Sequence, residues 1–132
     1  MLLDRVSSFE RVTFFVFRII IGLSFAQHGL QKLFGLLGGK QAELLSLMGL
    51  AGIIELAVGV FVAVGMFTRI FAFLGSVTMA VAYGMVHFPK GLIPIQNGGE
   101  LALLYFVAFM FLASRKVEQD IDASTIYKLF KG

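Results

Sequence analysis

The sequence contains no cysteine among its 132 residues. This absence excludes disulfide bonds, thiolate metal sites, iron–sulfur ligation and any thiol–disulfide reaction carried by the chain itself. Charged side chains are also scarce: they make up 14% of the residues, against roughly 25% in an average soluble domain. Because the chain has no thiols, any redox role requires a bound cofactor. The missing charges predict a membrane protein.

Hydrophobic residues take the place of the charges. They account for 58% of the chain, including 15 phenylalanines, and they gather into four apolar runs. A membrane-spanning helix needs about 20 apolar residues, so four spans with short connections use nearly the whole chain. We therefore expect an all-α, polytopic membrane protein whose four-helix bundle forms a single domain over residues 1–132, with no soluble catalytic domain. The predicted spans are about 12–34, 48–66, 69–88 and 98–114, followed by a tail at 115–132.

The distribution of lysine and arginine predicts the orientation. With four spans, both termini lie on one side, which carries seven basic residues against three on the other. Because cytoplasmic loops are enriched in basic residues, both termini and the tail are predicted to be cytoplasmic, in a bacterial inner membrane. The anionic membrane surface accounts for the net charge of +3, and no motif points to nucleic acid. The seven basic residues on the side of the termini are Arg5, Arg11, Arg69, Arg115, Lys116, Lys128 and Lys131. The three on the opposite side are Lys32, Lys40 and Lys90.

The connections between the spans differ in length. Residues 67–69 are so few that the second and third spans must form a tight antiparallel hairpin. The segment 89–99 holds both prolines and is predicted to be a loop, as is 35–46 with its glycines. Ser7 and Glu10 have capping-box spacing, which predicts a helix start near residue 8. Residues 123–132 resemble a short amphipathic helix on the membrane surface.

Four charged residues lie in or at the rims of the predicted spans: Arg18, Lys32, Glu55 and Glu100. A charge near the bilayer centre costs about 2.5–3.5 kcal/mol, so each needs a partner or a function. On a helical wheel, Arg18 and Lys32 share one face of the first span. Glu55 shares a face of the second span with Gly52 and Gly59, and this small-residue groove would let a neighbouring helix approach closely.

Polar side chains from all four spans are predicted to converge on the outer half of the bundle. At 1.5 Å of rise per residue, seven polar residues lie within about 10 Å of the outer boundary of the membrane. Arg18 lies nearer the inner boundary, where it either extends inward to the surface or reaches outward to Glu55. The seven converging residues are His28, Lys32, Glu55, Tyr83, His87, Asn97 and Glu100.

Each of these groups has a structural and a functional interpretation. Glu55 either pairs with a base to fix helix register, or carries protons or anchors a ligand, because burial and a neighbouring cation shift a carboxyl pKa in opposite directions. His28 and Lys32 either anchor the helix at the interface or form a basic pocket for a quinone carbonyl or an oxyanion. Haem ligation by His28 and His87 is disfavoured by their difference in depth, and a metal site including Glu100 is equally disfavoured.

A series of motifs links the chain to a known family. The first span contains an arginine and closes with "HGLQK" and "LFG"; the second reads "GIIELAVGVFVAVGMFTR". A histidine follows the third span, and the fourth opens with "NGGELALLYF". In order and spacing these motifs closely resemble the DoxX family, over about residues 18–112. The tail departs from the family, because it reads "SRKVEQDID" where many members have a Ser-Leu-Asp triplet; residues 121–122 would be its remnant.

The resemblance implies a link to quinone chemistry. The family is named after a membrane component associated with a terminal quinol oxidase, and relatives resemble subunits of thiosulfate:quinone oxidoreductase. The family pattern, carried onto the matching positions, points to Arg18, His28, Lys32, Glu55, Arg69 and Glu100.

Three functions remain open. The first is a subunit or accessory of a quinone-linked redox system, oxidising sulfur compounds or quinol, and at most the membrane subunit of an oxidoreductase. A quinone head would be bonded by His28, Lys32 or Tyr83, with Glu55 and Glu100 handling its protons and a partner redox protein supplying electrons. The second is a non-catalytic structural or assembly protein. The third is a small proton-coupled transporter that would have to form a homo-oligomer.

Overall fold

The computed structural model describes residues 1–116 and 131, and all regular structure in this part is helical. The predicted all-α class is confirmed for these residues. Three short elements connect the third and fourth of the long helices: the π-helix η1 (Tyr83–His87), the 3₁₀-helix η2 (Phe88–Lys90) and the single turn α4 (Pro94–Asn97). The long helices are α1 (Leu2–Phe34), α2 (Leu47–Val64), α3 (Thr68–Ala82) and α5 (Glu100–Ser114).

Among the described residues, two helical stretches are long and apolar enough to cross a membrane. They are Leu47–Val64 and Thr68–Lys90, the latter comprising α3 and its continuation through η1 and η2. The helix α5 is apolar but shorter, with 15 residues. Helices suited to crossing a membrane are thus present as predicted, while the count of four spans stays a prediction. The predicted surface helix at 123–132 lies, apart from residue 131, outside the described residues.

The first helix begins earlier than predicted and ends where the first predicted span ends. α1 starts at Leu2, so the capping-box start near residue 8 is wrong. No proline and no glycine precede Gly22, so nothing in this stretch stops the helix from extending. At the other end Gly35 adopts φ 66°, and its N–H bonds the carbonyl of Gln31. This left-handed cap ends α1.

The second and third helices form the predicted hairpin. Ser46 caps α2, since its side chain accepts a hydrogen bond from the N–H of Gly49 at 3.1 Å. α2 ends at Gly65, which adopts φ 80°, and Met66 donates its N–H to the carbonyl of Phe61. This is a Schellman cap. Phe67 also has a positive φ, of 50°, and α3 begins at the next residue.

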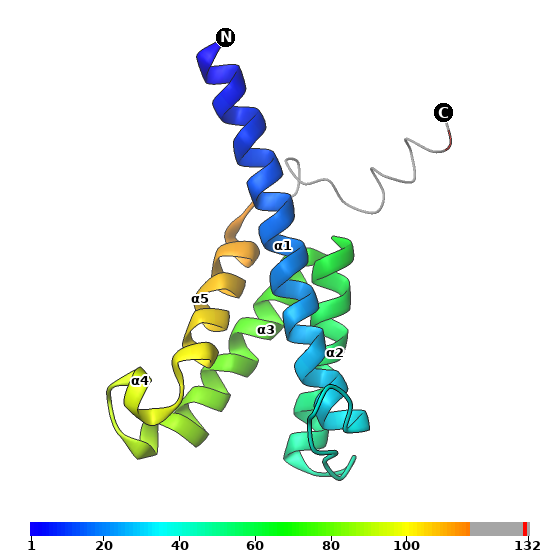
Figure 1. The fold of residues 1–132 in the computed structure, drawn as a ribbon, viewed down its shortest axis with the longest axis vertical. Coiled ribbons are helices and arrows are strands. Elements are labelled where there is room, and N and C mark those ends of the chain that lie inside the picture. The colour runs from blue at the N-terminus through cyan, green and yellow to red at the C-terminus, as the bar shows by residue number, and fades with distance from the viewer. Residues whose placement is uncertain (117–130, 132) are drawn as a thin grey trace.

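The long helices pack as two pairs (Figure 1). α1 lies along α2, and α3 lies along α5, while the α2–α3 hairpin joins the pairs. The pairs diverge toward the end that carries α4 and the loop after α1, which is the predicted outer end. The buried centre contains Phe25 and Val58, with Phe109 and Leu112 from α5. The rings of Phe25 and Phe109 meet edge to face at a centroid distance of 4.7 Å.

Glycines bring the backbones of α1 and α2 into direct contact. A Cβ added at Gly22 would lie 2.5 Å from the backbone nitrogen of Ala63. A Cβ at Gly29 would lie 2.5 Å from the backbone nitrogen of Leu56, and Gly59 is equally crowded by α1. Such distances leave no room for any side chain. The small-residue groove predicted on α2 is therefore occupied by α1, and this contact sets the register between the two helices.

Candidate functional site

The two helices of the first pair carry an ion pair near their outer ends. The Nζ of Lys32 on α1 lies 2.5 Å from Oε1 of Glu55 on α2. The Glu55 side chain is 3% exposed and that of Lys32 is 23% exposed. Gly52 lies one turn from Glu55, and a Cβ there would lie 2.9 Å from Cβ of Lys32. The missing side chain at Gly52 lets the lysine stem cross α2 and reach the acid.

The second oxygen of the Glu55 carboxyl group is the chemically open position of this site. Within the described residues, Oε2 is fully buried and makes no hydrogen bond. A buried acceptor left without a partner costs about 1–3 kcal/mol. That cost is lowered when Oε2 accepts a hydrogen bond from a small molecule. The site therefore has one oxygen bonded to a cation and one oxygen that can accept a hydrogen bond.

An aromatic cluster on α1 and α5 includes Tyr105, which lies near Glu55. Tyr105 on α5 is 6% exposed, and the side chain of Ser24 also lies near it. The His28 ring meets the Tyr105 ring edge to face at a centroid distance of 5.9 Å. The centroid of the Phe25 ring lies 5.1 Å from that of the Tyr105 ring. α5 thus supplies a wall of the site that sequence reasoning missed. The available signal was a tyrosine in the middle of an apolar helix, whose hydroxyl needs a partner when buried.

The predicted polar residues Tyr83, His87 and Asn97 form a separate group on η1 and α4. Asn97 is 2% exposed, and its Nδ2 donates to the Tyr83 hydroxyl at 3.1 Å and to the Gly91 carbonyl at 2.8 Å. Its Oδ1 accepts from the N–H of Gly99 at 2.7 Å. The Nδ1 of His87 lies 3.2 Å from the carbonyl oxygen of Asn97. These bonds tie residues 88–99 to the end of the third helix.

The structure therefore places the seven converging residues in two groups rather than one. His28, Lys32 and Glu55 lie in the first group, and among the described residues no hydrogen bond or ion pair joins them to the second. The two histidines, considered above as haem ligands, fall in different groups. Glu100 joins neither: it is exposed in the first turn of α5, where a carboxylate interacts favourably with the helix dipole.

Arg18 points toward the inner end, as in the first of its two predicted alternatives, but it stays buried there instead of reaching the surface. It is 1% exposed, and its guanidinium lies against Gly65, where an added Cβ would lie 2.6 Å from Nη1. The C-terminus of α2 carries the negative end of the helix dipole, which stabilises a cation there. The guanidinium carbon also lies 5.4 Å from the centre of the Phe15 ring. Glu55 is thus paired with Lys32 and not with Arg18.

Arg69, to which the family resemblance also points, lies at the inner end of the second helix pair. Its Nε donates to the backbone carbonyl of Ala113 at 3.0 Å. That carbonyl belongs to the last turn of α5 and has no partner within its own helix. Arg69 therefore fastens the end of α5 to the start of α3, far from Glu55 along the bundle.

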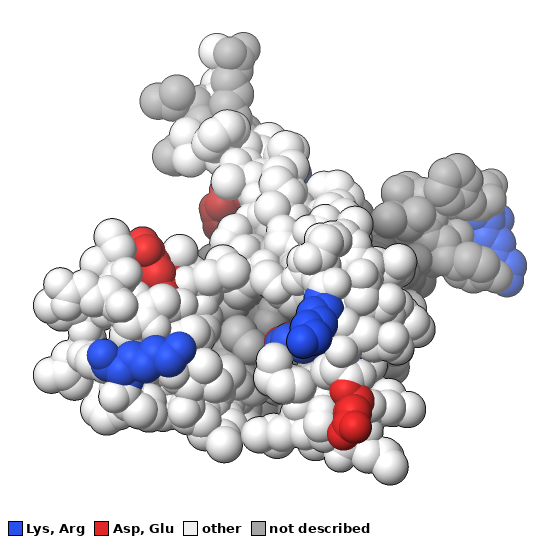
Figure 2. All heavy atoms as spheres, turned by 60° about the horizontal axis from the view of Figure 1, so that its bottom comes forward, with Lys and Arg blue, Asp and Glu red and all other residues white. Residues whose placement is uncertain are grey.

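The outer end of the molecule is hollowed between the two helix pairs (Figure 2). Basic side chains lie on both sides of this hollow. The basic residues of the predicted outer segments are Lys32, Lys40 and Lys90. The Lys32–Glu55 pair thus lies toward the end where the helix pairs diverge.

Comparisons with known proteins identify the family. The DoxX family model matches residues 13–88, more than half of the chain. An uncharacterized protein of Haemophilus influenzae is 40% identical over 101 residues, which cover 71% of this chain and 75% of that protein. No solved structure matches the chain. The family match spans α1, α2, α3 and η1 and so includes both residues of the buried ion pair. The chain therefore belongs to the DoxX family.

Proposed function

We propose that the protein is the membrane component of a quinone-linked redox system in a bacterial inner membrane, with a quinone headgroup site at Glu55. The observation that carries this proposal is the buried carboxyl group with one oxygen on Lys32 and the other without a partner among the described residues. The proposed topology of four spans with cytoplasmic termini would put this site in the outer half of the bilayer. The quinone would supply the two-electron redox chemistry, and a partner protein would exchange electrons with it.

The residues around Glu55 fit a quinone headgroup in both its oxidation states. When ionised, Oε2 accepts a hydrogen bond from a quinol hydroxyl; when protonated, it donates one to a quinone carbonyl. His28 adds a ring nitrogen close by, and the Tyr105 and Phe25 rings offer apolar faces for a flat ring. Lys32 holds the carboxyl group in place through the bond from its Nζ to Oε1. Tyr83 is engaged by Asn97, so the quinone contacts are assigned to the first group.

Proton exchange with the aqueous phase is the second task of the site. Glu55 is buried, so its proton has to pass through a more exposed group. Lys32 and His28 are both partly exposed and are the proposed route for this proton. Glu100 is exposed at the same end of the bundle and is the proposed outermost acceptor. This arrangement would release protons from quinol oxidation on the outer side of the membrane.

The experiment is the analysis of quinone that copurifies with the protein. Wild type, Glu55→Gln and His28→Ala are purified in mild detergent, and their lipid extracts are analysed by absorbance and mass spectrometry. Glu43→Gln is the matched control, since Glu43 is exposed in the loop after α1. We expect quinone in wild type and the control, and a clear loss in the two site variants. Absence of quinone from all preparations, including those supplied with excess quinone, contradicts the proposal.

A structural role is the second candidate, favoured by the way the ion pair joins α1 to α2. Lys32 and Glu55 would then only fix the register that the glycine contacts set. This function predicts that Glu55→Gln lowers the stability of the bundle and leaves its quinone content unchanged. The same set of variants, measured for both properties, distinguishes the two functions.

A further inference from the structure

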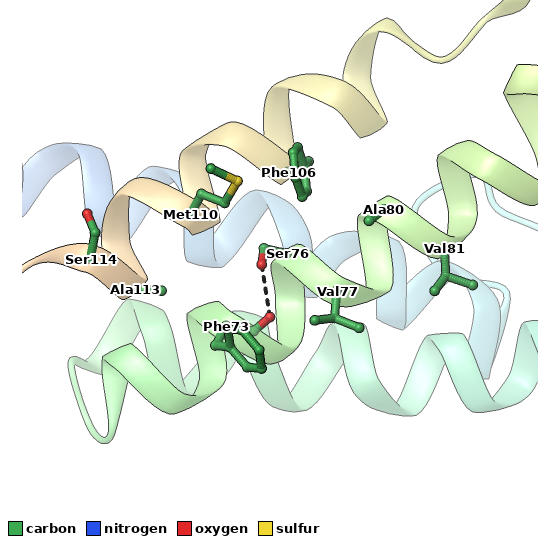
Figure 3. A pocket seen from close by; sticks show the side chains of 9 residues that line it. All are labelled: Phe73, Ser76, Val77, Ala80, Val81, Phe106, Met110, Ala113 and Ser114. Carbon is green, nitrogen blue, oxygen red and sulfur yellow. Dashed lines mark hydrogen bonds between the residues drawn. The ribbon is translucent and has the colours of Figure 1, made fainter.

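A groove runs along an exposed face of the second helix pair, α3 and α5 (Figure 3). It has a volume of about 530 Å³ and lies between α3 and α5. Phe73, Val77 and Val81 line it from α3, and Phe106 and Met110 from α5. Small side chains, including Ala80, keep it open, and most of its lining residues are exposed. In a membrane this face meets the acyl chains of lipids.

A cation marks one end of the groove. Arg69 precedes Phe73 by one helical turn, so both lie on the same face of α3. Its Nε bonds the carbonyl of Ala113, a residue that itself lines the groove. Arg69 is exposed at the end that the distribution of basic residues places at the cytoplasmic surface. The groove is therefore apolar along its length and positively charged where it reaches the headgroup layer.

We propose that this groove binds one acyl chain of an anionic phospholipid whose phosphate contacts Arg69. The lining from Phe73 to Val81 covers about 12 Å of helix rise, parallel to the direction of the lipid chains. Basic pockets at the cytoplasmic side of membrane helices are suited to anionic headgroups. The positive charge of Arg69 also argues against a second copy of the chain as the occupant of the groove. In a two-fold dimer across this face, the two Arg69 side chains would meet at the same membrane depth and repel each other.

The test counts bound lipids by native mass spectrometry of purified protein to which chain-matched phosphatidylglycerol or phosphatidylcholine is added. Ala80→Phe fills the groove, and Arg69→Gln removes the charge. Val60→Phe enlarges an exposed residue on α2, and Arg11→Gln removes a cation on α1, so both serve as matched controls. Arg69→Lys keeps the charge. It shows whether lipid binding depends on this charge or on the hydrogen bond from Arg69 to the carbonyl of Ala113.

We expect wild type to retain phosphatidylglycerol in preference to phosphatidylcholine. Arg69→Gln should weaken that binding roughly fivefold, the weight of one arginine facing an anionic surface, while Arg69→Lys keeps most of it. Ala80→Phe should weaken the binding of both lipids, and the two controls should match wild type. Equal retention of the two lipids by wild type, or undiminished phosphatidylglycerol binding by Ala80→Phe, overturns the proposal. A wild-type dimer that Ala80→Phe dissociates also overturns it, because the groove would then hold a second copy.

Discussion

At the scale of single residues, Glu55 combines burial with an incomplete set of hydrogen bonds. A helical wheel places Lys32 and Arg18 on one face of α1, so the sequence offers two cationic partners for the acid. The choice between them depends on how far α1 is shifted along α2. That shift is set by the contacts of Gly22 and Gly29 with the α2 backbone, which no single-helix pattern reveals. Tyr105 was missed for the same reason, because it reaches Glu55 from a helix that the wheel treats separately.

The ion pair leads to a prediction about stability. Lys32→Ala leaves a buried acid without its cation, so we expect it to lower the free energy of unfolding by roughly 3 kcal/mol, the lower end of the range for breaking a buried pair. Replacing both partners in Lys32→Met with Glu55→Leu should restore most of that loss, because no charge is left buried. Unfolding in mixed micelles, followed by circular dichroism, measures both variants.

Lys40→Ala, which removes an exposed lysine from the same end of the molecule, should leave the free energy of unfolding unchanged. If the double variant is less stable than Lys32→Ala, the interpretation of Glu55 as a buried charge held by Lys32 is wrong.

At the scale of helices, the glycine contacts between α1 and α2 lead to a second prediction. Gly29→Ala forces a methyl group into the backbone of α2 and should destabilise the protein by about 1–3 kcal/mol, as overpacking generally does. Gly84→Ala is the matched control, since nothing lies within 4 Å of a Cβ at that position. It should be neutral or slightly stabilising, because alanine favours helix over glycine. Thermal unfolding in detergent compares the two, and equal effects would contradict the close contact.

Helix ends were easier to predict than helix partners. Gly35 and Gly65 each end a helix with a left-handed residue, and the joint at 67–69 left room only for a hairpin. The pairing of α1 with α2 and of α3 with α5 depends on side-chain fit between helices distant in sequence. That fit also separates the polar residues into two groups, because Tyr83, His87 and Asn97 serve the segment after α3. A depth estimate alone could not show this division.

At the scale of the whole molecule, the absence of cysteine makes the proposed topology directly testable. Single cysteines at Lys40, Lys90, Arg11 and Lys116, all exposed, need no background of native thiols to be removed. A membrane-impermeant maleimide added to spheroplasts should label Lys40→Cys and Lys90→Cys. Arg11→Cys and Lys116→Cys should be labelled only after lysis. The reverse pattern, or labelling of all four from outside, contradicts four spans with cytoplasmic termini.

The whole molecule combines a closely packed first pair, which holds the buried acid, with a second pair whose α5 helix brings Tyr105 near that acid. The hollow at the predicted outer end lies between these pairs. The proposed function therefore needs both the close α1–α2 contact and the divergence of the two pairs.

The binding of a short-chain quinone to purified protein tests the central claim most directly. We predict saturable binding by wild type and by Glu43→Gln, and roughly tenfold weaker binding by Glu55→Gln, the loss expected for one hydrogen bond to a charged group. No saturable binding by wild type, or equal affinity in wild type and Glu55→Gln, would contradict a quinone site at Glu55.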